Sequence, residues 1–176
     1  MDFVERLSQE LRDAWGMKVS GSFAADGGVV FNAGVFAAPH EEADYQESVY
    51  SFYYCERASR GAALFQTTNR QVFDHCVLQY YGNPLRSRYG FPELTLGNTA
   101  SIRSGWTMVR TGSSLRHDYL GIRSDDGKFY PCKTGDFRLL AGLSHVVEYS
   151  PLEVLECYLR EDAAPLLSQW LSKPAG

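Results

Sequence analysis

The sequence lacks the signatures of the common nucleotide-binding and hydrolytic enzymes. Its 176 residues contain no GxGxxG turn, no Walker loop and no GxSxG elbow. No stretch approaches the roughly 18 uncharged apolar residues that a membrane helix needs. The charged start, MDFVERLSQELRD, has no apolar run of the kind found in signal peptides. These absences favour a cytoplasmic chain that has no cofactor and no membrane partner.

Cysteine is scarce, and its spacing predicts neither disulfides nor a metal site. The cysteines lie far apart and form no CxxC pair; they are Cys55, Cys76, Cys132 and Cys157. A structural zinc site normally brings closely spaced ligand pairs, and disulfides belong mainly to exported proteins. We therefore expect four free thiols.

A strong excess of charge is also missing, although the charges are unevenly placed. The net charge is −4, and residues 1–56 carry ten acids against three bases, whereas residues 85–117 carry five arginines against one acid. An acidic total argues against a nucleic-acid partner. The acidic N-terminal third predicts either a face for a basic partner or ordinary solvated surface, and the composition leaves both open.

Aromatic residues, by contrast, are abundant, at 14% of the chain. The segment 48–57, SVYSFYYCER, is β-branched and aromatic and contains neither Gly nor Pro. Tyr50, Phe52 and Tyr54 alternate with Val49, Ser51, Tyr53 and Cys55, so both faces carry apolar groups. This pattern predicts a central strand with something packed on each side.

Three helices follow from apolar spacing and capping signals. Residues 2–15 have an amphipathic pattern that stops at Gly16, and a T-x-x-Q box at Thr68 starts a helix over 69–81. That helix is expected to end at Gly82-Asn83-Pro84. A third helix begins at Pro151 and is broken by Pro165, before a last turn that includes Trp170.

The remaining pattern predicts strands and polar loops. Strands are expected at 18–24, 29–36, 62–66, 105–110, 118–123, 128–132 and 144–149, the last after a short helical piece. Loops are expected at 37–47, 56–61 and 82–104. The fold class is therefore α+β: a single domain, 1–176, with a mainly antiparallel sheet flanked by N-terminal, middle and C-terminal helices. The expected core includes Leu7, Leu11, Phe52, Tyr54, Val77, Leu155 and Leu159.

Two groups of residues carry side chains of the kinds that catalysis or metal binding uses. A thiol enzyme would use Cys76 or Cys132 as nucleophile with His117 as base, but no surrounding motif supports it. His40, Glu41, Glu42 and Asp44 form the densest set of metal-ligand types, yet their spacing matches neither HExxH nor an EF-hand loop. We expect a solvated acidic loop there, with no catalytic residue and no bound metal.

The segment GDFRLLAGLSHVVEYSPLEVLECYLRED (135–162) and the strand SVYSFYYCER together resemble a known family. They are similar to the polymorphic-toxin immunity proteins, the family of the antitoxin of the tuberculosis necrotizing toxin, which is a NAD+ glycohydrolase. The resemblance implies an inhibitor without chemistry of its own. Such a protein would bind its cognate toxin as a heterodimer and cover the active site.

Under this resemblance, polar loops on a rigid scaffold are the expected interface. Three loops qualify: His40 to Glu47, Arg57 to Gly61, and Arg86 to Phe91. The predicted partner-binding residues supply charges and Arg or aromatic anchors; they are Asp44, Tyr45, Glu47, Arg57, Ser59, Arg60, Arg88 and Tyr89. Two alternatives stay open, the thiol enzyme and a secretion-system adaptor or chaperone that binds a client through the acidic N-terminal surface.

Overall fold

The computed structural model describes residues 2–21, 28–32, 39–56, 59–96, 101–111 and 119–172. The helices are α1 (Phe3–Trp15), α2 (Arg70–Arg88), α3 (Phe137–Val146), α4 (Pro151–Tyr158) and a 3-10 turn, η1 (Ser168–Trp170). The strands are β1 (Lys18–Gly21), β2 (Gly28–Asn32), β3 (His40–Gln46), β4 (Val49–Glu56), β5 (Ser59–Thr67), β6 (Trp106–Arg110), β7 (Tyr119–Ser124) and β8 (Phe129–Thr134). The predicted α+β class is confirmed.

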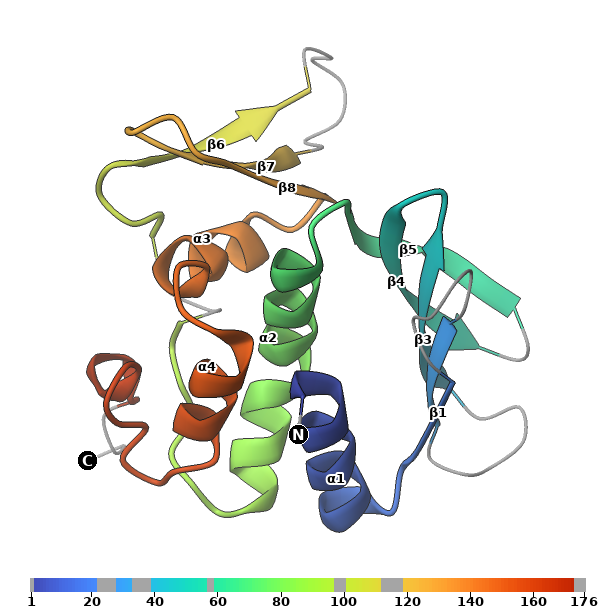
Figure 1. Ribbon diagram of the computed structural model, residues 1–176. Coiled ribbons are helices and arrows are strands. Elements are labelled where there is room, and N and C mark those ends of the chain that lie inside the picture. Colours follow the sequence, from blue (N-terminus) through green and yellow to red (C-terminus); the bar gives the residue numbers. More distant parts are fainter. Residues whose placement is uncertain are drawn as a thin grey trace.

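Over these residues the strands form one antiparallel sheet in the order β1-β2-β3-β4-β5-β8-β7-β6. β4 pairs with β3 on one side and β5 on the other, which confirms the central strand predicted at 48–57, apart from Arg57, which lies outside the described residues. β5 and β8 are paired only at Phe65 and Gln66. Figure 1 shows the result: β6, β7 and β8 turn over the top of the helices, while β3, β4 and β5 run down one side.

The helices fill the concave side of this bent sheet, with α2 at the centre (Figure 1). α2 contacts α1, α3 and α4, and also β4, β5 and β8. Phe65 stacks on Phe52 at 5.2 Å between ring centroids and lies 5.6 Å from Phe73 of α2. These rings join the sheet to the helical layer.

Most of the predicted core is confirmed, and two residues are corrected. Five of the predicted residues are buried: Leu7, Leu11, Phe52, Val77 and Leu155. Tyr54 is 40% exposed, because it lies beside the open side of β5 rather than under a helix. Leu159 is only half-buried, since it caps α4 instead of continuing it.

The predicted end of the first helix at Gly16 and the predicted start of the last helix at Pro151 are confirmed. Asp2 and Glu5 form a capping box at α1, and Gly16 ends the helix in the left-handed conformation with φ 68°. Ser150 and Glu153 form a second box at α4. α4 nevertheless ends at Tyr158, so the prediction that this helix runs to Pro165 is wrong.

The predicted end of the middle helix at Gly82-Asn83-Pro84 is also wrong, because α2 continues to Arg88. Gly82 is needed for packing: a Cβ there would lie 2.3 Å from Cε1 of Tyr158. Asn83 bonds both the amide and the carbonyl of Leu94, at 2.8 and 2.7 Å. Tertiary contacts therefore outweigh a local stop signal.

The start of α2 differs from the prediction as well. The N-cap is Asn69, whose side chain accepts a hydrogen bond from the amide of Val72, so the box predicted at Thr68 does not form. Gln71 instead donates to the carbonyls of Val147 and Tyr149, at 2.9 and 3.0 Å. It thereby joins α2 to the end of α3.

Three other local predictions are corrected. The expected loop over 37–47 contains strand β3, the expected strand over 144–149 is the end of α3 followed by a turn, and Ser59–Gly61 belong to β5 rather than to a turn. The hairpin of β7 and β8 is confirmed, as is the pairing of β1 with β2, although the turn between the latter lies outside the described residues. None of the described helices is long and apolar enough to cross a membrane.

Candidate partner interface

The outer face of β3, β4 and β5, away from the helices, carries a polar cluster built by strand alternation. Glu41 faces the helices, where its carboxylate accepts hydrogen bonds from Tyr80 and Tyr81 of α2, each at 2.9 Å. Because side chains alternate along a strand, His40, Glu42 and Asp44 take the opposite face. The register places Cys55 beside His40, and Arg60 beside Cys55.

Arg60 is the centre of this outer-face cluster, defined as His40, Glu42, Asp44, Tyr53, Cys55 and Arg60. Its Nη2 and Nε donate to Oε2 of Glu42 at 2.6 and 2.9 Å, and its Nη1 donates to Oδ2 of Asp44 at 2.9 Å. The guanidinium also lies 4.5 Å from the centre of the Tyr53 ring. The Arg60 side chain stays 44% exposed while these contacts fix its position.

Hydrogen bonds within the cluster favour the charged forms of Arg60 and Glu42. The hydrogen bond to Glu42, followed by that to Asp44, raises the pKa of Arg60 above its ordinary value. Burial by itself would raise the pKa of Glu42, but the hydrogen bonds from Arg60 and His40 outweigh it and lower that pKa. The outer face therefore presents the guanidinium of Arg60, which stays charged and is held between Glu42 and Asp44.

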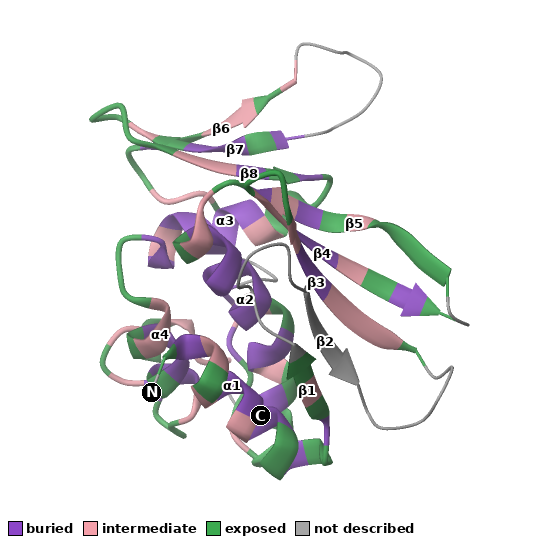
Figure 2. Ribbon diagram, turned by 45° about the vertical axis from the view of Figure 1, so that its right-hand side comes forward, coloured by how far each residue is buried: buried purple, intermediate pink, exposed green. Residues whose placement is uncertain are grey.

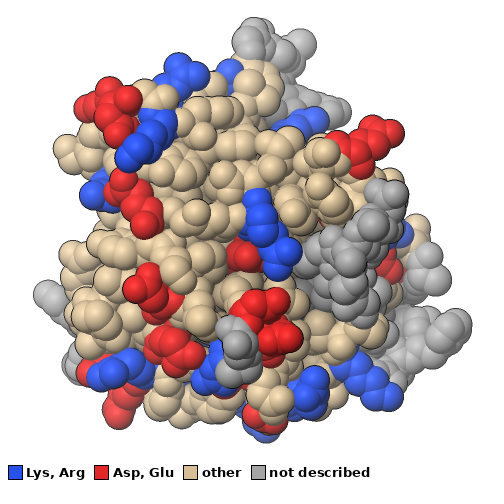
Figure 3. Space-filling model, viewed as in Figure 1, with Lys and Arg blue, Asp and Glu red and all other residues tan. Residues whose placement is uncertain are grey.

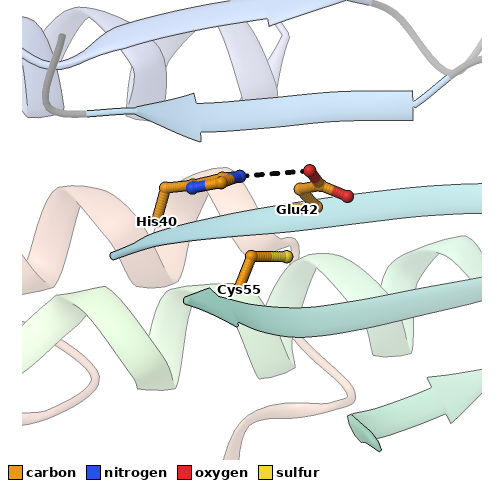
Figure 4. A group of neighbouring side chains, drawn as sticks. All are labelled: His40, Glu42 and Cys55. Atoms are coloured by element: carbon orange, nitrogen blue, oxygen red, sulfur yellow. Dashed lines mark hydrogen bonds and ion pairs between the residues drawn. The ribbon is translucent and has the colours of Figure 1, made fainter. Parts of the chain in front are cut away.

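The same cluster contains the donor set of a possible cation site. Ligand atoms of His40, Glu42 and Cys55 lie within 4.8 Å of one another, and Figure 4 shows His40 and Glu42 pointing toward each other from β3 above Cys55 of β4. Nitrogen, oxygen and sulfur donors suit zinc. However, Arg60 already holds the Glu42 carboxylate, and burial raises the pKa of the Cys55 thiol. The polar network as it stands satisfies these groups without a cation.

Strand β3 also divides the four possible metal ligands that are close together in the sequence between its two faces. His40, Glu42 and Asp44 share the outer face, whereas Glu41 is bound to α2 on the inner face. The predicted partner residues divide in the same way. Asp44 and Arg60 meet on the outer face, while Tyr45 faces inward and stacks on Tyr50 at 4.4 Å.

The other predicted partner residues are dispersed. Glu47 lies in the turn between β3 and β4 with φ 48°, Ser59 is the exposed first residue of β5, and Arg57 lies outside the described residues. Arg88 and Tyr89 end α2 and contact α1, through a 2.8 Å bond to the Ala14 carbonyl and a 2.7 Å bond to Glu10. They form a second patch, separate from the outer-face cluster.

The structure also shows residues that sequence reasoning missed. A cavity of about 460 Å³ lies between β5, β8 and the helices, and Cys76 and Tyr158 form its buried floor. Exposed Leu64 and Tyr80 line its rim. No sequence signal could have found it, because its walls come from segments that are distant in the chain.

The thiol-enzyme residues pack as core. Sγ of Cys76 lies 3.7 Å from Sγ of Cys132, both side chains have 0% exposure, and burial raises the pKa of Cys76 well above its ordinary value. His117 lies outside the described residues. The prediction of four free thiols is confirmed, and all four are buried.

Charge on the surface is mixed rather than one-sided. On the face seen in Figure 3, acidic and basic side chains are interspersed, with broad uncharged areas between them. Several acids of the N-terminal third have internal partners: Glu10 binds Arg6, and Glu42 and Asp44 bind Arg60. The acidic N-terminal sequence therefore does not translate into a purely negative surface.

Comparison with known proteins agrees with this fold. A solved structure described as Rv3902c from M. tuberculosis is similar, with a TM-score of 0.68 and 20% sequence identity over 92% of this chain and 91% of that one. A search of the curated proteins gave no significant match. Residues 25–166 match the profile of the family described as Immunity protein 61. Because this match spans most of the sequence, the chain belongs to the Immunity protein 61 family.

Proposed function

We propose that this chain is a cytoplasmic immunity protein that binds a cognate NAD+ glycohydrolase toxin as a heterodimer and blocks its active site sterically. The observation that carries the immunity role is the family match over residues 25–166. The NAD+ glycohydrolase target is supported by the resemblance of segments 48–57 and 135–162 to the antitoxin of such a toxin.

The outer-face cluster is the surface that we assign to toxin binding. Arg60 is exposed but held by Glu42 and Asp44, so little of its side-chain entropy remains to be lost when a partner binds. Arginine is also among the residues that most often anchor interfaces. Ser59, next to Arg60, and Glu47, at the far end of β3, would lie at the edges of this surface. Arg88 and Tyr89 would form a separate contact.

The two alternatives receive less support from the geometry. A thiol nucleophile must reach its substrate, and both Cys76 and Cys132 are fully buried. An adaptor that binds through acidic charge would need free acids, whereas Glu42 and Asp44 are neutralised by Arg60. A steric inhibitor needs only a rigid, shaped surface.

The proposal is tested by expressing, in one host, this chain and the toxin domain encoded beside its gene. We expect the chain to restore growth and the cellular NAD+ level, and to form a one-to-one complex with the purified toxin. Toxicity that persists at full expression of the chain, together with no complex, would contradict the proposal. Restored growth with an unchanged NAD+ level would contradict only the assigned toxin activity.

Charge reversals then test the assigned surface. Arg60→Glu is expected to weaken the complex about tenfold or more, the magnitude of losing one charged anchor. Asp44→Lys, Arg57→Glu and Arg88→Glu test the other predicted positions. Arg123→Glu is the matched control, because Arg123 is an exposed arginine on β7 in the other half of the sheet. Full protection by all four test variants, with melting temperatures unchanged, would refute this surface.

A further inference from the structure

Within the part of the chain that the structure describes, the first half of β5 is an open strand edge in the middle of the sheet. β5 pairs with β4 along one side, whereas β8 reaches its other side only at Phe65 and Gln66. Ser59–Ala62 and Leu64 are exposed, and Figure 2 shows this half of β5 projecting past β8 as an exposed stretch. Such an edge presents a row of backbone N–H and C=O groups that a further strand can use.

The edge has few of the features that normally prevent an edge strand from pairing with another chain. Its residues after Arg60 are small and uncharged, Gly61-Ala62-Ala63, with no proline. Arg60 does not cover the edge, because Glu42 and Asp44 hold its side chain on the outer face. The junction with β8 is closed by a 2.9 Å bond from Oγ1 of Thr134 to the Leu64 carbonyl. The open stretch is therefore Ser59–Ala63.

A cavity of about 460 Å³ begins where this edge ends. Leu64 connects the two: it directly follows the open stretch as the last exposed residue of β5, and it lines the cavity. Gln79 of α2 also lines the cavity, and among the described residues neither Oε1 nor Nε2 of its buried amide has a hydrogen-bond partner. Both atoms are shielded from solvent, and Oε1 packs beside Gly142 of α3, so the Gln79 side chain must turn toward the cavity before an occupant with a polar tip can bond it. The bonds gained would offset the cost of leaving the amide unpaired.

We infer that an extended segment of the toxin adds to the Ser59–Ala63 edge as a strand and places a side chain in this cavity, against the amide of Gln79. The inference rests on the proposed function and names the docking mode. Strand addition takes its affinity from main-chain hydrogen bonds and its specificity from pockets for alternate side chains, and both parts are adjacent here.

The chemistry and the position of the edge both indicate that its partner is an extended segment of the toxin. Only an extended polypeptide offers donors and acceptors at the roughly 3.3 Å spacing of a strand. The edge is continuous with Arg60, the centre of the proposed toxin-binding surface. Tyr54 and Tyr80 are 40% and 38% exposed, and they supply aromatic anchors of the kind that dominate interfaces. The inserted side chain should have an apolar body and a hydrogen-bonding tip.

Hydrogen exchange measured by mass spectrometry tests the inference on the unmodified chain, alone and in complex with the toxin domain encoded beside its gene. We expect those amides of 59–63 that point away from β4 to exchange quickly in the free chain and to become protected in the complex. β6 is the internal control, because it is a terminal strand of the same sheet with one free side. Protection at β6 with none at 59–63 would overturn the inference.

Substitutions supply an independent readout. Ala62→Pro removes one edge amide at a position without a register partner on β4 and should weaken toxin binding about tenfold or more. Ala62→Val keeps the amide and should bind nearly as tightly.

Gln79→Leu should weaken binding about tenfold without lowering the melting temperature, because it also removes an unsatisfied polar group. A merely structural role for Gln79 predicts the opposite: lower stability with binding unchanged.

The outcomes are distinguishable from those of the proposed function. Absence of any complex overturns both proposals. A tight complex in which 59–63 stay unprotected and both variants bind normally overturns strand addition alone. Concentration-dependent dimers of the free chain that Ala62→Pro abolishes would show that a second copy occupies the edge, and this too would overturn the inference.

Discussion

Arg86 shows how one residue can connect segments that the sequence keeps apart. The sequence places it in an expected interface loop, Arg86 to Phe91, but it lies in the last turn of α2 and its side chain has 0% exposure. The guanidinium donates to the carbonyls of Pro92, Tyr158, Arg160 and Glu161, at 2.6, 3.0, 2.6 and 2.8 Å. Several of these acceptors follow the C-terminus of α4, where carbonyls lack helical partners and attract cations. Arg86 thus serves as a shared cap between α2 and α4.

We predict that Arg86→Ala lowers the free energy of unfolding by about 3 kcal/mol or more, because it leaves buried carbonyls unpaired and opens a cavity. Arg86→Lys should recover only part of this loss, since an ammonium cannot reproduce the planar fork. Arg88→Ala is the matched control, with one hydrogen bond and an exposed side chain. Urea denaturation measures all three. Equal losses for Arg86→Ala and Arg88→Ala would contradict the capping role.

His75 and Asp74, neighbours in α2, respond to acid in opposite directions. Burial lowers the pKa of His75 to about 4 from 6.5, against the hydrogen bond to the Tyr149 carbonyl. Between pH 6.5 and about pH 4 the unfolded chain therefore binds more protons at this position than the folded chain does. The contribution of neutral His75 to the free energy of unfolding is complete above pH 6.5 and is lost as the pH falls toward 4. Burial raises the pKa of Asp74 to about 6 from 3.8, despite Arg70. For Asp74 the folded chain binds more protons, so its contribution increases as the pH falls.

His75 and Asp74 change the free energy of unfolding with pH in opposite directions, so single variants should separate their two contributions. Relative to the parent chain, His75→Gln is expected to gain free energy of unfolding between about pH 7 and pH 4.5, and Asp74→Asn is expected to lose it, each by at most about 1.4 kcal/mol per pH unit. Chemical denaturation across this range measures both differences. Curves that run parallel to the parent at every pH would show that neither group titrates as described.

At the scale of elements, α4 has clear start signals in its own sequence, but its stability depends on packing against the rest of the protein. It has a capping box and Pro at its first position, yet it is only eight residues long, too short to be stable alone. Its buried face includes Val154, Leu155 and Tyr158, and Tyr158 packs against Gly82 of α2. Tertiary packing holds the helix that the capping signals begin.

Leu155→Ala is predicted to cost about 2–5 kcal/mol, the range for deleting a fully buried leucine. Leu152→Ala in the same helix is the comparison and should cost less, because Leu152 is only half-buried. Both losses can be measured by urea denaturation. A loss below about 1 kcal/mol for Leu155→Ala would mean that α4 is loosely docked.

At the scale of the whole molecule, the sheet bends around the helices, and its two parts are joined only where Phe65 and Gln66 of β5 pair with β8. This bend encloses the aromatic core on one side and leaves the open half of β5 on the other. Every cysteine is buried, although the cysteines belong to β4, α2, β8 and α4. Reactivity of the thiols therefore reports on the integrity of the whole fold.

We predict that the native chain reacts with a thiol reagent such as DTNB only at the rate at which it opens, because the thiolate is the reactive species and all four side chains are buried. In denaturant all four thiols should react at once. Alkylation followed by mass spectrometry identifies the sites. Rapid labelling of native Cys55 would show that the outer face of β4 is more accessible than described.

The sequence by itself determined the α+β class, the central strand, the end of α1 at Gly16, the start of α4 at Pro151 and the β7–β8 hairpin, because each depends on residues that are neighbours in the chain. Only the tertiary structure decided the rest. The acidic segment 40–46 became a strand because Arg60 neutralises its outer acids and Tyr80 and Tyr81 bind Glu41 on the inner face. α2 passed through Gly82-Asn83-Pro84 because Tyr158 and Leu94 stabilise that stretch from outside the helix. The outer-face cluster and the cavity beside β5 likewise join segments from distant parts of the chain, and no local pattern encodes such contacts.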